Sequence, residues 1–362
     1  MKKKKILFVV PHRPDRAPSQ RFRFEQYLSF LNENGFEFDY SALLEEEDDK
    51  VFYKHGDLFS KAIVFFKSIR RRQRDVRRVG NYDLVFIQRE AFMTGSTRFE
   101  KRFKKSGTKL VFDFDDAIWL SNVSDANRKF NWLKDPGKTA KLIAMSDLVF
   151  AGNDFLADYA RQFNKNVVVV PTTIDTEEYV AMNVNCDSEK IIIGWSGSIT
   201  TIKHFEFALP FLKILKKKYG DKLEIKVIGD VNYANEELGI KGIAWNKENE
   251  IRDLSTFDIG IMPLPDDEWA KGKCGLKGLQ YMALEIPTLM SPVGVNAEIV
   301  QHGVNGFLPA TTEEWVASIE TLISSPERRK KMGEAARKTV EENYSVKVWK
   351  GKYLELFARL LK

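Results

Sequence analysis

The chain has 362 residues, of which 43% are hydrophobic and 30% are charged, and its formal net charge is +6. This length predicts about two to three domains, and the composition is typical of a globular protein rather than a disordered one. The longest apolar runs, such as Ile6–Val10 and Ala62–Phe66, are far shorter than the roughly 20 residues that cross a membrane. The first run resembles part of a secretory signal, but it is too short and Pro11–Pro14 follows at once, so we expect no export.

The two cysteines, Cys186 and Cys274, lie far apart in the sequence and match no metal-binding or redox spacing. Such a pair suits a reducing compartment, where structural disulfides are rare. We therefore expect a cytoplasmic protein without a structural disulfide.

Positive charge is concentrated in the first half of the chain. Residues 1–150 contain 30 basic and 21 acidic residues, a net charge of +9, whereas residues 151–362 contain 27 and 30, a net charge of −3. The densest basic stretch is Lys61–Arg78, and such a surface attracts anionic lipids, nucleic acid or phosphorylated substrates. Aromatic residues do not alternate with its arginines, so we expect no nucleic-acid partner. The alternatives are a solvated helix face, or a helix over residues 58–79 that holds the protein at the inner face of an anionic membrane.

In the first half, short apolar strands alternate with longer helices. The strand Ile6–Val10 precedes a helix at Ser19–Leu31, and the strand Phe36–Leu43 precedes the basic helix Leu58–Val79. Further strands are predicted at Leu84–Gln88, Leu110–Phe114, Leu148–Ala151 and Val167–Val170. This alternation indicates a parallel sheet, in which ligands bind at the carboxyl ends of the strands.

The segment Asp175–Lys190 has no periodicity and predicts a linker, after which the alternation restarts. Strands are expected at Ile191–Gly194, Leu223–Gly229, Ile240–Trp245, Phe257–Pro263, Pro287–Ser291 and Gly306–Pro309. Helices are expected at His204–Tyr219, Asn249–Ser255, Leu276–Leu284, Thr312–Ser324, Glu327–Asn343 and Val346–Leu361. The sequence therefore predicts an α/β protein of two doubly wound, Rossmann-like domains, residues 1–178 and 188–345, that face each other across a cleft.

The clearest functional signal is the segment Gly272–Met282, which follows the predicted strand Phe257–Pro263 and opens a helix. Its glycines leave backbone N–H groups accessible at the helix start and let a ligand approach closely. The helix N-terminus adds partial positive charge, and Lys273 and Lys277 add full charges. The segment predicts a diphosphate-binding site, with a solvated, lysine-rich helix start as the alternative.

A second glycine-containing loop, Gly194–Lys203, joins the first strand of the second half to its first helix. Gly197, Ser198 and Lys203 make it a candidate phosphate loop, although it matches neither the Walker loop nor the dinucleotide fingerprint. The loop is important because the strand before it and the strand Phe257–Pro263 can end beside the same ligand.

Three carboxylates, Asp113, Asp115 and Asp116, stand at the end of a predicted strand. The alternatives are an acceptor-orienting or catalytic role, a structural role such as a helix cap, and binding of Mg²⁺ or Mn²⁺. We favour the acceptor or catalytic role. Metal binding is least expected, because the candidate phosphate loops belong to the other half of the chain.

Arg21, Arg23 and Arg89 are candidates for binding an anionic acceptor, because a guanidinium group makes bidentate contacts with oxyanions. For Arg21 and Arg23 the anion can instead be a donor phosphate. A solvated helix face is the alternative for the first two, and an ion pair with Glu90 is the alternative for Arg89. The four histidines show no zinc-site spacing, so no metal site is predicted.

The segment Gly275–Pro287 resembles the carboxyl-terminal signature of retaining family-4 glycosyltransferases, which reads Gly-Leu, then Glu-Ala-Met-Ala, a small residue and Pro. The resemblance covers most of the chain, is strongest in Gly272–Leu308 and is diffuse in the first half. The other segments that fit are Val170–Asp175, Gly197–Lys203, Ser291–Val300 and Asn305–Leu308.

This resemblance implies the GT-B fold, with the donor nucleotide on the second domain and the acceptor on the first. It implies that the final helix, residues 346–362, packs back onto the first domain. It also implies a nucleotide-diphosphate sugar as the donor substrate and no bound metal ion or other cofactor.

The same resemblance assigns roles to individual residues. The amides of Gly275 and Leu276 would hold the diphosphate together with Lys203. Lys277 or Lys273 would neutralise the charge of the leaving group, as preorganised donors do at low reorganisation cost. Trp245 or Asn246, at a strand end, would lie beside the base.

The sequence departs from the family at its paired glutamates, which fall here on Gly272 and Gln280. Gln280 can still hydrogen-bond ribose hydroxyls, as a neutral amide with both a donor and an acceptor. Asp266, Asp267 or Glu268 can replace the missing first carboxylate. The loop arginine is absent as well, and Lys273 can supply its charge.

The leading hypothesis is a retaining glycosyltransferase that moves a sugar from a nucleotide sugar to a surface-glycan or lipid-linked acceptor. A non-catalytic sugar-nucleotide-binding module is one alternative, motivated by the two missing glutamates. A sugar-nucleotide epimerase of the same architecture is the other, and the scarcity of histidine argues against it.

Overall fold

The computed structural model describes residues 3–52, 56–120, 135–182 and 190–362. The chain forms two compact units: unit 1 is Met1–Thr172 with Lys350–Lys362, and unit 2 is Thr173–Trp349. The boundary predicted from the sequence for the first domain was residue 178. Cys186 lies outside the described residues, and Cys274 is buried. Within the described ranges, no helix is both long and apolar enough to span a membrane.

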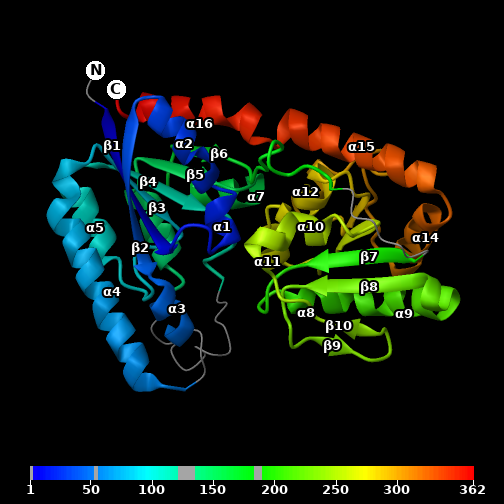
Figure 1. Cartoon of the computed structure of the whole chain (residues 1–362). Coiled ribbons are helices and arrows are strands. Elements are labelled where there is room, and N and C mark those ends of the chain that lie inside the picture. The colour runs from blue at the N-terminus through cyan, green and yellow to red at the C-terminus, as the bar shows by residue number, and fades with distance from the viewer. Residues whose placement is uncertain (1–2, 53–55, 121–134, 183–189) are drawn as a thin grey trace. The chain divides into compact units, whose positions relative to one another are not determined.

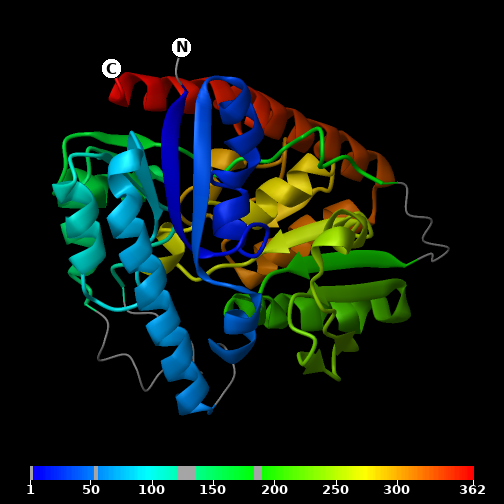
Figure 2. The same cartoon turned by 60° about the vertical axis from the view of Figure 1, so that its left-hand side comes forward.

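Unit 1 is built on a six-stranded, all-parallel sheet with the order β2-β1-β3-β4-β5-β6 (Figure 1). The strands are β1 (Lys4–His12), β2 (Phe36–Leu44), β3 (Leu84–Gln88), β4 (Lys109–Phe114), β5 (Leu148–Ala151) and β6 (Val167–Val169). Five consecutive residues of β1, Ile6–Val10, have no exposed area. Such a continuous apolar run is what a strand covered on both faces needs, and helices cover both faces of this sheet (Figures 1 and 2).

The helices of unit 1 are α1 (Pro18–Arg21), α2 (Leu28–Glu33), α3 (Glu46–Phe52), α4 (Leu58–Arg78), α5 (Arg98–Lys105), α6 (Lys138–Met145), α7 (Asp154–Arg161) and the end of α16 (Val346–Leu360). The helix expected at Ser19–Leu31 is interrupted after α1, and a short 3₁₀ helix, Glu25–Tyr27, precedes α2. Phe24, with φ −141°, leaves helical geometry and stacks on Phe8 at 4.9 Å between ring centroids. Core packing therefore overrides the helical pattern at this point.

The end of α16 completes the core of unit 1. Tyr353 stacks on Tyr27 with 4.5 Å between ring centroids, and Phe357 stacks on Phe150 at 5.9 Å. Tyr353 and Phe357 are both buried. A segment nearly 180 residues beyond β6 in the sequence thus supplies two aromatic side chains to this core.

We expect Phe357→Ala to destabilise the protein by about 3–5 kcal/mol, because it removes a buried ring and leaves a cavity among other aromatic side chains. Urea unfolding followed by tryptophan fluorescence measures this loss. Glu355→Ala, an exposed change on the same helix, is the matched control and should cost less than about 0.5 kcal/mol. If Phe357→Ala cost as little stability as the control, α16 would not be part of the core.

Unit 2 contains a parallel sheet with the order β12-β11-β7-β8. Single parallel bridges extend it on both sides, from Ile228 to Ile243 and from Leu289 to Phe307. The strands are β7 (Ile191–Ser196), β8 (Leu223–Ile228), β11 (Ile259–Met262) and β12 (Thr288–Met290), beside a small antiparallel pair of β9 (Ala234–Asn235) and β10 (Ile240–Lys241). The chain order reverses between β7 and β11, which makes their carboxyl ends the topological switch point where ligands of such sheets bind.

Two strands predicted from sequence are much shorter in the structure. In the expected strand Ile240–Trp245, β10 covers only two residues, and Ile243 makes a single bridge to the sheet. The backbone passes close to its neighbours here, since a Cβ on Gly242 would lie 1.9 Å from the Asp230 carbonyl oxygen. The expected strand Gly306–Pro309 is likewise reduced to single bridges, from Gly306 to His302 and from Phe307 to Leu289.

The helices of unit 2 are α8 (Ile202–Phe205), α9 (Leu209–Tyr219), α10 (Glu250–Leu254), α11 (Glu268–Lys271), α12 (Leu276–Ala283), α13 (Asn296–Ile299), α14 (Thr312–Ile323), α15 (Pro326–Asn343) and the start of α16. A hydrophobic core joins the sheet to α8, α9 and α14. Within it, Phe211 of α9 and Trp315 of α14 stack with 4.6 Å between ring centroids. This packing fixes α8, and the loop before it, at the end of β7.

Candidate functional site

The carboxyl ends of β7 and β11 bring together the two loops that the sequence analysis selected. Tyr281 of α12 reaches the end of β7, where its hydroxyl accepts a 2.7 Å hydrogen bond from the Ser196 amide and lies 2.9 Å from the Ser196 hydroxyl. A Cβ on Gly278 would lie 1.6 Å from the Met290 methyl group, so glycine lets α12 lie close against β12. The segment after β11 is thereby tied to the loop after β7.

The N-terminus of α12 is shaped by Gly275. Its φ is +70°, so glycine is required for conformation, and an added Cβ would lie 2.4 Å from Cδ1 of Ile299, which would have to move. No side chain caps this helix, and the first backbone amide that bonds within it is that of Leu279, to the Gly275 carbonyl. The amides of the first helical residues therefore have no acceptor inside the helix, which favours an anion at this point.

Three lysines converge beside this helix start. Lys277 lies over the Trp195 ring at 5.4 Å, and Lys273 lies over the Trp269 ring at 5.0 Å. Lys277 and Lys273, together with Lys203 of α8, also lie close enough to the buried His204 to disfavour its protonation. Burial, and then the positive charges of these three lysines, lower the pKa of His204 to about 4. Positive charge from two distant segments is thus gathered at one edge of the sheet.

The loop residues Gly197 and Ser198 are engaged within the loop itself. A Cβ on Gly197 would lie 2.2 Å from the Trp195 ring, so glycine is needed for packing. The Ser198 amide donates a 2.9 Å hydrogen bond to the Thr201 hydroxyl, and its own hydroxyl lies 3.0 Å from that of Thr200. In this loop, Lys203 is the group that contributes charge to the site.

Trp245 and Gln280 meet in a buried network that the sequence analysis did not predict. Trp245 Nε1 donates to Glu250 Oε1 at 2.8 Å, and the Tyr179 hydroxyl donates to Glu250 Oε2 at 2.6 Å. Gln280 Nε2 donates to the Tyr179 hydroxyl at 3.0 Å and to Glu250 Oε1 at 3.2 Å. Glu250 therefore places a carboxylate beside position 280. Tyr179 lies 71 residues before Glu250, and no spacing in the sequence connects them.

Two of the three candidates for replacing the missing glutamate near Gly272, Asp266 and Asp267, have structural partners. Asp267 accepts a 2.7 Å hydrogen bond from the Ala270 amide and caps α11, and Asp266 pairs with Lys271 at 3.1 Å. Gly272 itself ends α11, with its amide bonded to the carbonyls of Glu268 and Trp269.

In unit 1, Arg23 and Asp113 are paired inside the core. Arg23 Nη2 lies 2.5 Å from Asp113 Oδ1, and both side chains have almost no exposed area. Burial raises the pKa of Asp113, and the facing Arg23 partly offsets this. A further bond from Arg23 goes to the Val170 carbonyl. This is the geometry of an ion pair that joins distant segments of the unit. Arg21, the neighbouring candidate, is buried as well.

Arg89, Asp115 and Asp116 form a partly exposed cluster at the ends of β3 and β4. Arg89 Nε lies 2.8 Å from Asp115 Oδ1, and its Nη2 lies 2.6 Å from Asp116 Oδ2. Burial alone would lower the pKa of Arg89, but the two carboxylates outweigh it and raise that pKa. Arg89 has a φ of +61°, a strained conformation that occurs often at functional sites. Among the described residues, no group of three or more His, Cys, Asp or Glu could hold a metal ion.

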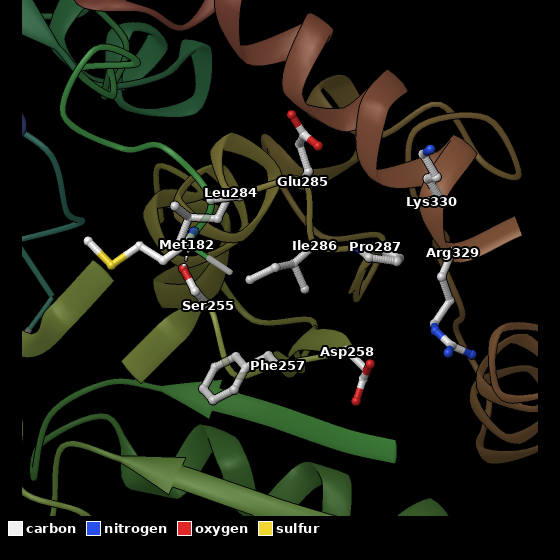
Figure 3. A pocket seen from close by; sticks show the side chains of 11 residues that line it. Met182, Ser255, Phe257, Asp258, Leu284, Glu285, Ile286, Pro287, Arg329 and Lys330 are labelled. Carbon is white, nitrogen blue, oxygen red and sulfur yellow. Dashed lines mark hydrogen bonds between the residues drawn. The ribbon is translucent and has the colours of Figure 1, made fainter. Parts of the chain in front are cut away.

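A separate pocket of unit 2 lies at the opposite, amino-terminal edge of its sheet (Figure 3). Its volume is about 190 Å³. Its polar groups hold the surrounding loops: Asp258 accepts a 2.8 Å hydrogen bond from the Ile192 amide, and Ser255 accepts one from the Met182 amide at 3.3 Å. This pocket is not the candidate site, because it lies at the amino-terminal rather than the carboxyl ends of the strands and its polar groups already hold loops.

We expect Gly275→Ala to destabilise the protein by about 2–4 kcal/mol, since it combines a strained φ with a clash against Ile299. Gly303→Ala is the matched control: its φ is also positive, at +78°, but no atom lies within 4 Å of the added Cβ. The control should cost only about 1 kcal/mol, for the backbone strain alone. Urea unfolding of both variants measures the difference, and equal losses would contradict the close contact.

Comparison with known proteins places this site in a family context. Residues 258–339 match the family model described as glycosyl transferases group 1. The glycosyltransferase 1 domain-containing protein 1 of Xenopus tropicalis is 29% identical over 121 residues, which are 33% of this chain and 35% of that protein. The alignment thus spans about a third of the length of this relative.

Solved structures resemble the chain over its whole length. A glycosyltransferase from Rickettsia africae is 16% identical, with a TM-score of 0.69 and full coverage of both chains. Anabaena HepE, in complex with UDP and glucose, is 13% identical with a TM-score of 0.67, covering 98% of this chain and 100% of that one. Sucrose-phosphate synthase from Thermosynechococcus elongatus is 12% identical with a TM-score of 0.68 and 99% coverage of both.

These similarities confirm the predicted fold class: the chain has the α/β architecture of GT-B glycosyltransferases, with two Rossmann-like units. The family-model match and the structural neighbours together support a relation to glycosyltransferases of group 1. The family-4 subtype and retention of configuration stay predictions.

Proposed function

We propose that the chain is a glycosyltransferase that takes its sugar from a nucleotide-diphosphate donor bound to unit 2. The observation that carries this proposal is the convergence of Lys203, Lys273 and Lys277 with the uncapped N-terminus of α12 at the switch point of the sheet. A diphosphate brings two negative charges and several acceptor oxygens, which match these cations and amides. The match of residues 258–339 to the glycosyl transferases group 1 model supports the same assignment.

The chemistry of the reaction explains why the site needs this charge. When the glycosyl bond to the diphosphate breaks, negative charge grows on the leaving nucleoside diphosphate. Lysines and backbone amides that already point at this position stabilise that charge without reorganising. In this proposal Lys277 and Lys273 carry the leaving-group charge, Gly275 and Leu276 hold the diphosphate with their amides, and no bound metal ion is required.

The proposal extends to the donor, the stereochemistry and the acceptor. HepE is described in complexes with UDP and with UDP-glucose, so UDP-sugars are the first donors to test. We further propose retention of configuration, from the resemblance of Gly275–Pro287 to family-4 enzymes, and a surface-glycan or lipid-linked acceptor. In unit 1, the partly exposed cluster of Arg89, Asp115 and Asp116 is the acceptor candidate that remains accessible.

Helix α4 supports a lipid-linked acceptor and a peripheral location at the cytoplasmic face of a membrane (Figure 2). One stripe of this helix, at spacings of three and four residues, is exposed throughout. Its first half is apolar and its second half is basic. The stripe consists of Phe59, Ile63, Phe66, Arg70, Arg74 and Arg77. Phe59 and Phe66 are 79% and 62% exposed, so the helix offers rings for insertion next to charges for anionic head groups.

Lys277→Ala should lower kcat for donor hydrolysis or transfer by about 100-fold, because it removes one preorganised charge at the leaving group. Release of the nucleoside diphosphate from UDP- and GDP-sugars measures the rate. Lys213→Ala is the control, because this exposed lysine of α9 pairs with Glu237 and should leave kcat unchanged.

Failure of every nucleotide sugar to bind, measured by calorimetry, would contradict the proposed function. Binding without any turnover would instead favour the non-catalytic sugar-nucleotide-binding module. The residues at Gly272 and Gln280 give that second candidate its support, since the paired glutamates of the family are absent there.

The double variant Phe59→Ser/Phe66→Ser should weaken binding to vesicles of phosphatidylglycerol and phosphatidylcholine by about tenfold or more, because two rings no longer enter the bilayer. Co-sedimentation measures the bound fraction. Phe207→Ser, which changes a ring of unit 2 that is 52% exposed, is the matched control. Unchanged binding of the double variant, or no binding of the unaltered protein, would refute the membrane role of α4.

A further inference from the structure

His204 is a buried side chain to which the proposed reaction assigns no role. It lies on α8 between Lys203 and Phe205 and is only 4% exposed. Its Nδ1 atom is buried and has no hydrogen-bond partner. Buried polar atoms in folded proteins are nearly always paired, so an unpaired ring nitrogen at this position points to a missing partner.

The surroundings of His204 indicate what that partner is. The charged groups that act on it are Lys203 on its own helix, Lys273 before α12, Lys277 in the first turn of α12, and Asp267 at the start of α11. Three positive charges thus face one negative charge. The uncapped N-terminus of α12 adds to this excess, and an anion is the ligand that balances it.

The same surroundings keep the imidazole neutral. Burial, and then Lys277, Lys273 and Lys203, lower the pKa of His204 to about 4. A neutral imidazole has one N–H donor and one acceptor nitrogen, so the ring can donate to a phosphate oxygen without adding a fourth positive charge. Protonation becomes easier only when the lysine charges are offset.

We propose that His204 donates a hydrogen bond to the diphosphate of the donor and takes up a proton when the diphosphate binds. This inference rests on the proposed function, since it assigns the anion as the diphosphate of a nucleotide sugar. The two negative charges of the ligand offset the lysines and stabilise the protonated ring. The proton comes from solvent and forms an N–H bond on the imidazole ring, while no bond of the nucleotide sugar is formed or broken.

The direction in which pH changes the affinity for the donor follows from the linkage between proton binding at His204 and donor binding. The pKa of His204 is about 4 without ligand and higher with it, so between these two values the complex holds a proton that the free protein lacks. Affinity for the donor therefore rises as the pH falls through the higher value and levels off near the lower one. Well above both values, affinity is independent of this group.

The test is NMR of the full chain with labelled histidine imidazoles, titrated over pH with and without UDP-glucose and, separately, GDP-mannose. Both are diphosphate diesters that do not change charge in the range used. The chain has only four histidines, and the exposed His302 serves as the internal reference. We expect either donor that binds to shift the His204 signals and to raise its pKa by about one unit or more, while His302 stays unchanged.

Calorimetry at mildly acidic pH, in two buffers of different ionisation enthalpy, measures the proton uptake directly. His204→Phe should abolish this uptake and weaken donor binding by about tenfold, since it removes the hydrogen bond while keeping a similar ring. His204→Gln should recover most of the affinity through its amide donor but none of the proton uptake. His302→Gln is the control and should change neither quantity.

The outcomes separate this inference from the proposed function. Donor binding without a response of His204 and without proton uptake would overturn the role of His204 and leave glycosyl transfer intact. If neither donor binds, the inference falls together with the proposed function. Should His204→Phe not fold, the NMR titration of the unaltered protein still decides the question.

Discussion

The candidate site of unit 2 depends on the packing of α12 against the ends of β7 and β12, which holds like charges together at one edge of the sheet. Lys203, Lys273 and Lys277 come from two loops about 70 residues apart, and mutual repulsion opposes their approach. Packing overcomes that repulsion: the Tyr281 hydroxyl ties α12 to the end of β7, and Gly278 lets the helix lie against β12. A fold that maintains such an arrangement is suited to an anion that relieves it.

The Glu250 network complements this charge with a carboxylate near the same helix. Gln280 lacks the charge that the family resemblance expects, but its amide is held by Glu250 and by the Tyr179 hydroxyl. Negative charge therefore remains within hydrogen-bonding distance of position 280, on a different residue. Because Glu250 supplies this charge, the absence of a glutamate at position 280 is compatible with donor binding. Near Gly272, in contrast, Asp266 pairs with Lys271 and Asp267 caps α11, so these two carboxylates already have structural partners.

The sequence predicted correctly those features that depend on residues close together in the chain. The strand Ile6–Val10 and the start of α12 were foreseen because apolar runs and glycine–lysine spacing act over a few residues. The helix at Ser19–Leu31 was predicted without its break, because the break depends on Phe24 reaching Phe8. The pairing of Arg23 with Asp113, 90 residues away, and the unpaired nitrogen of His204 arise only in the folded chain. Sequence therefore indicated the charge of the site, but not the buried groups around it.

A crystal structure of the chain with UDP-glucose tests the central claim most directly. We predict the diphosphate at the N-terminus of α12, within hydrogen-bonding distance of the Leu276 amide and of the Nζ atoms of Lys203 and Lys277. A diphosphate bound elsewhere, such as at the amino-terminal edge of the sheet beside Arg329 and Lys330, would contradict it (Figure 3).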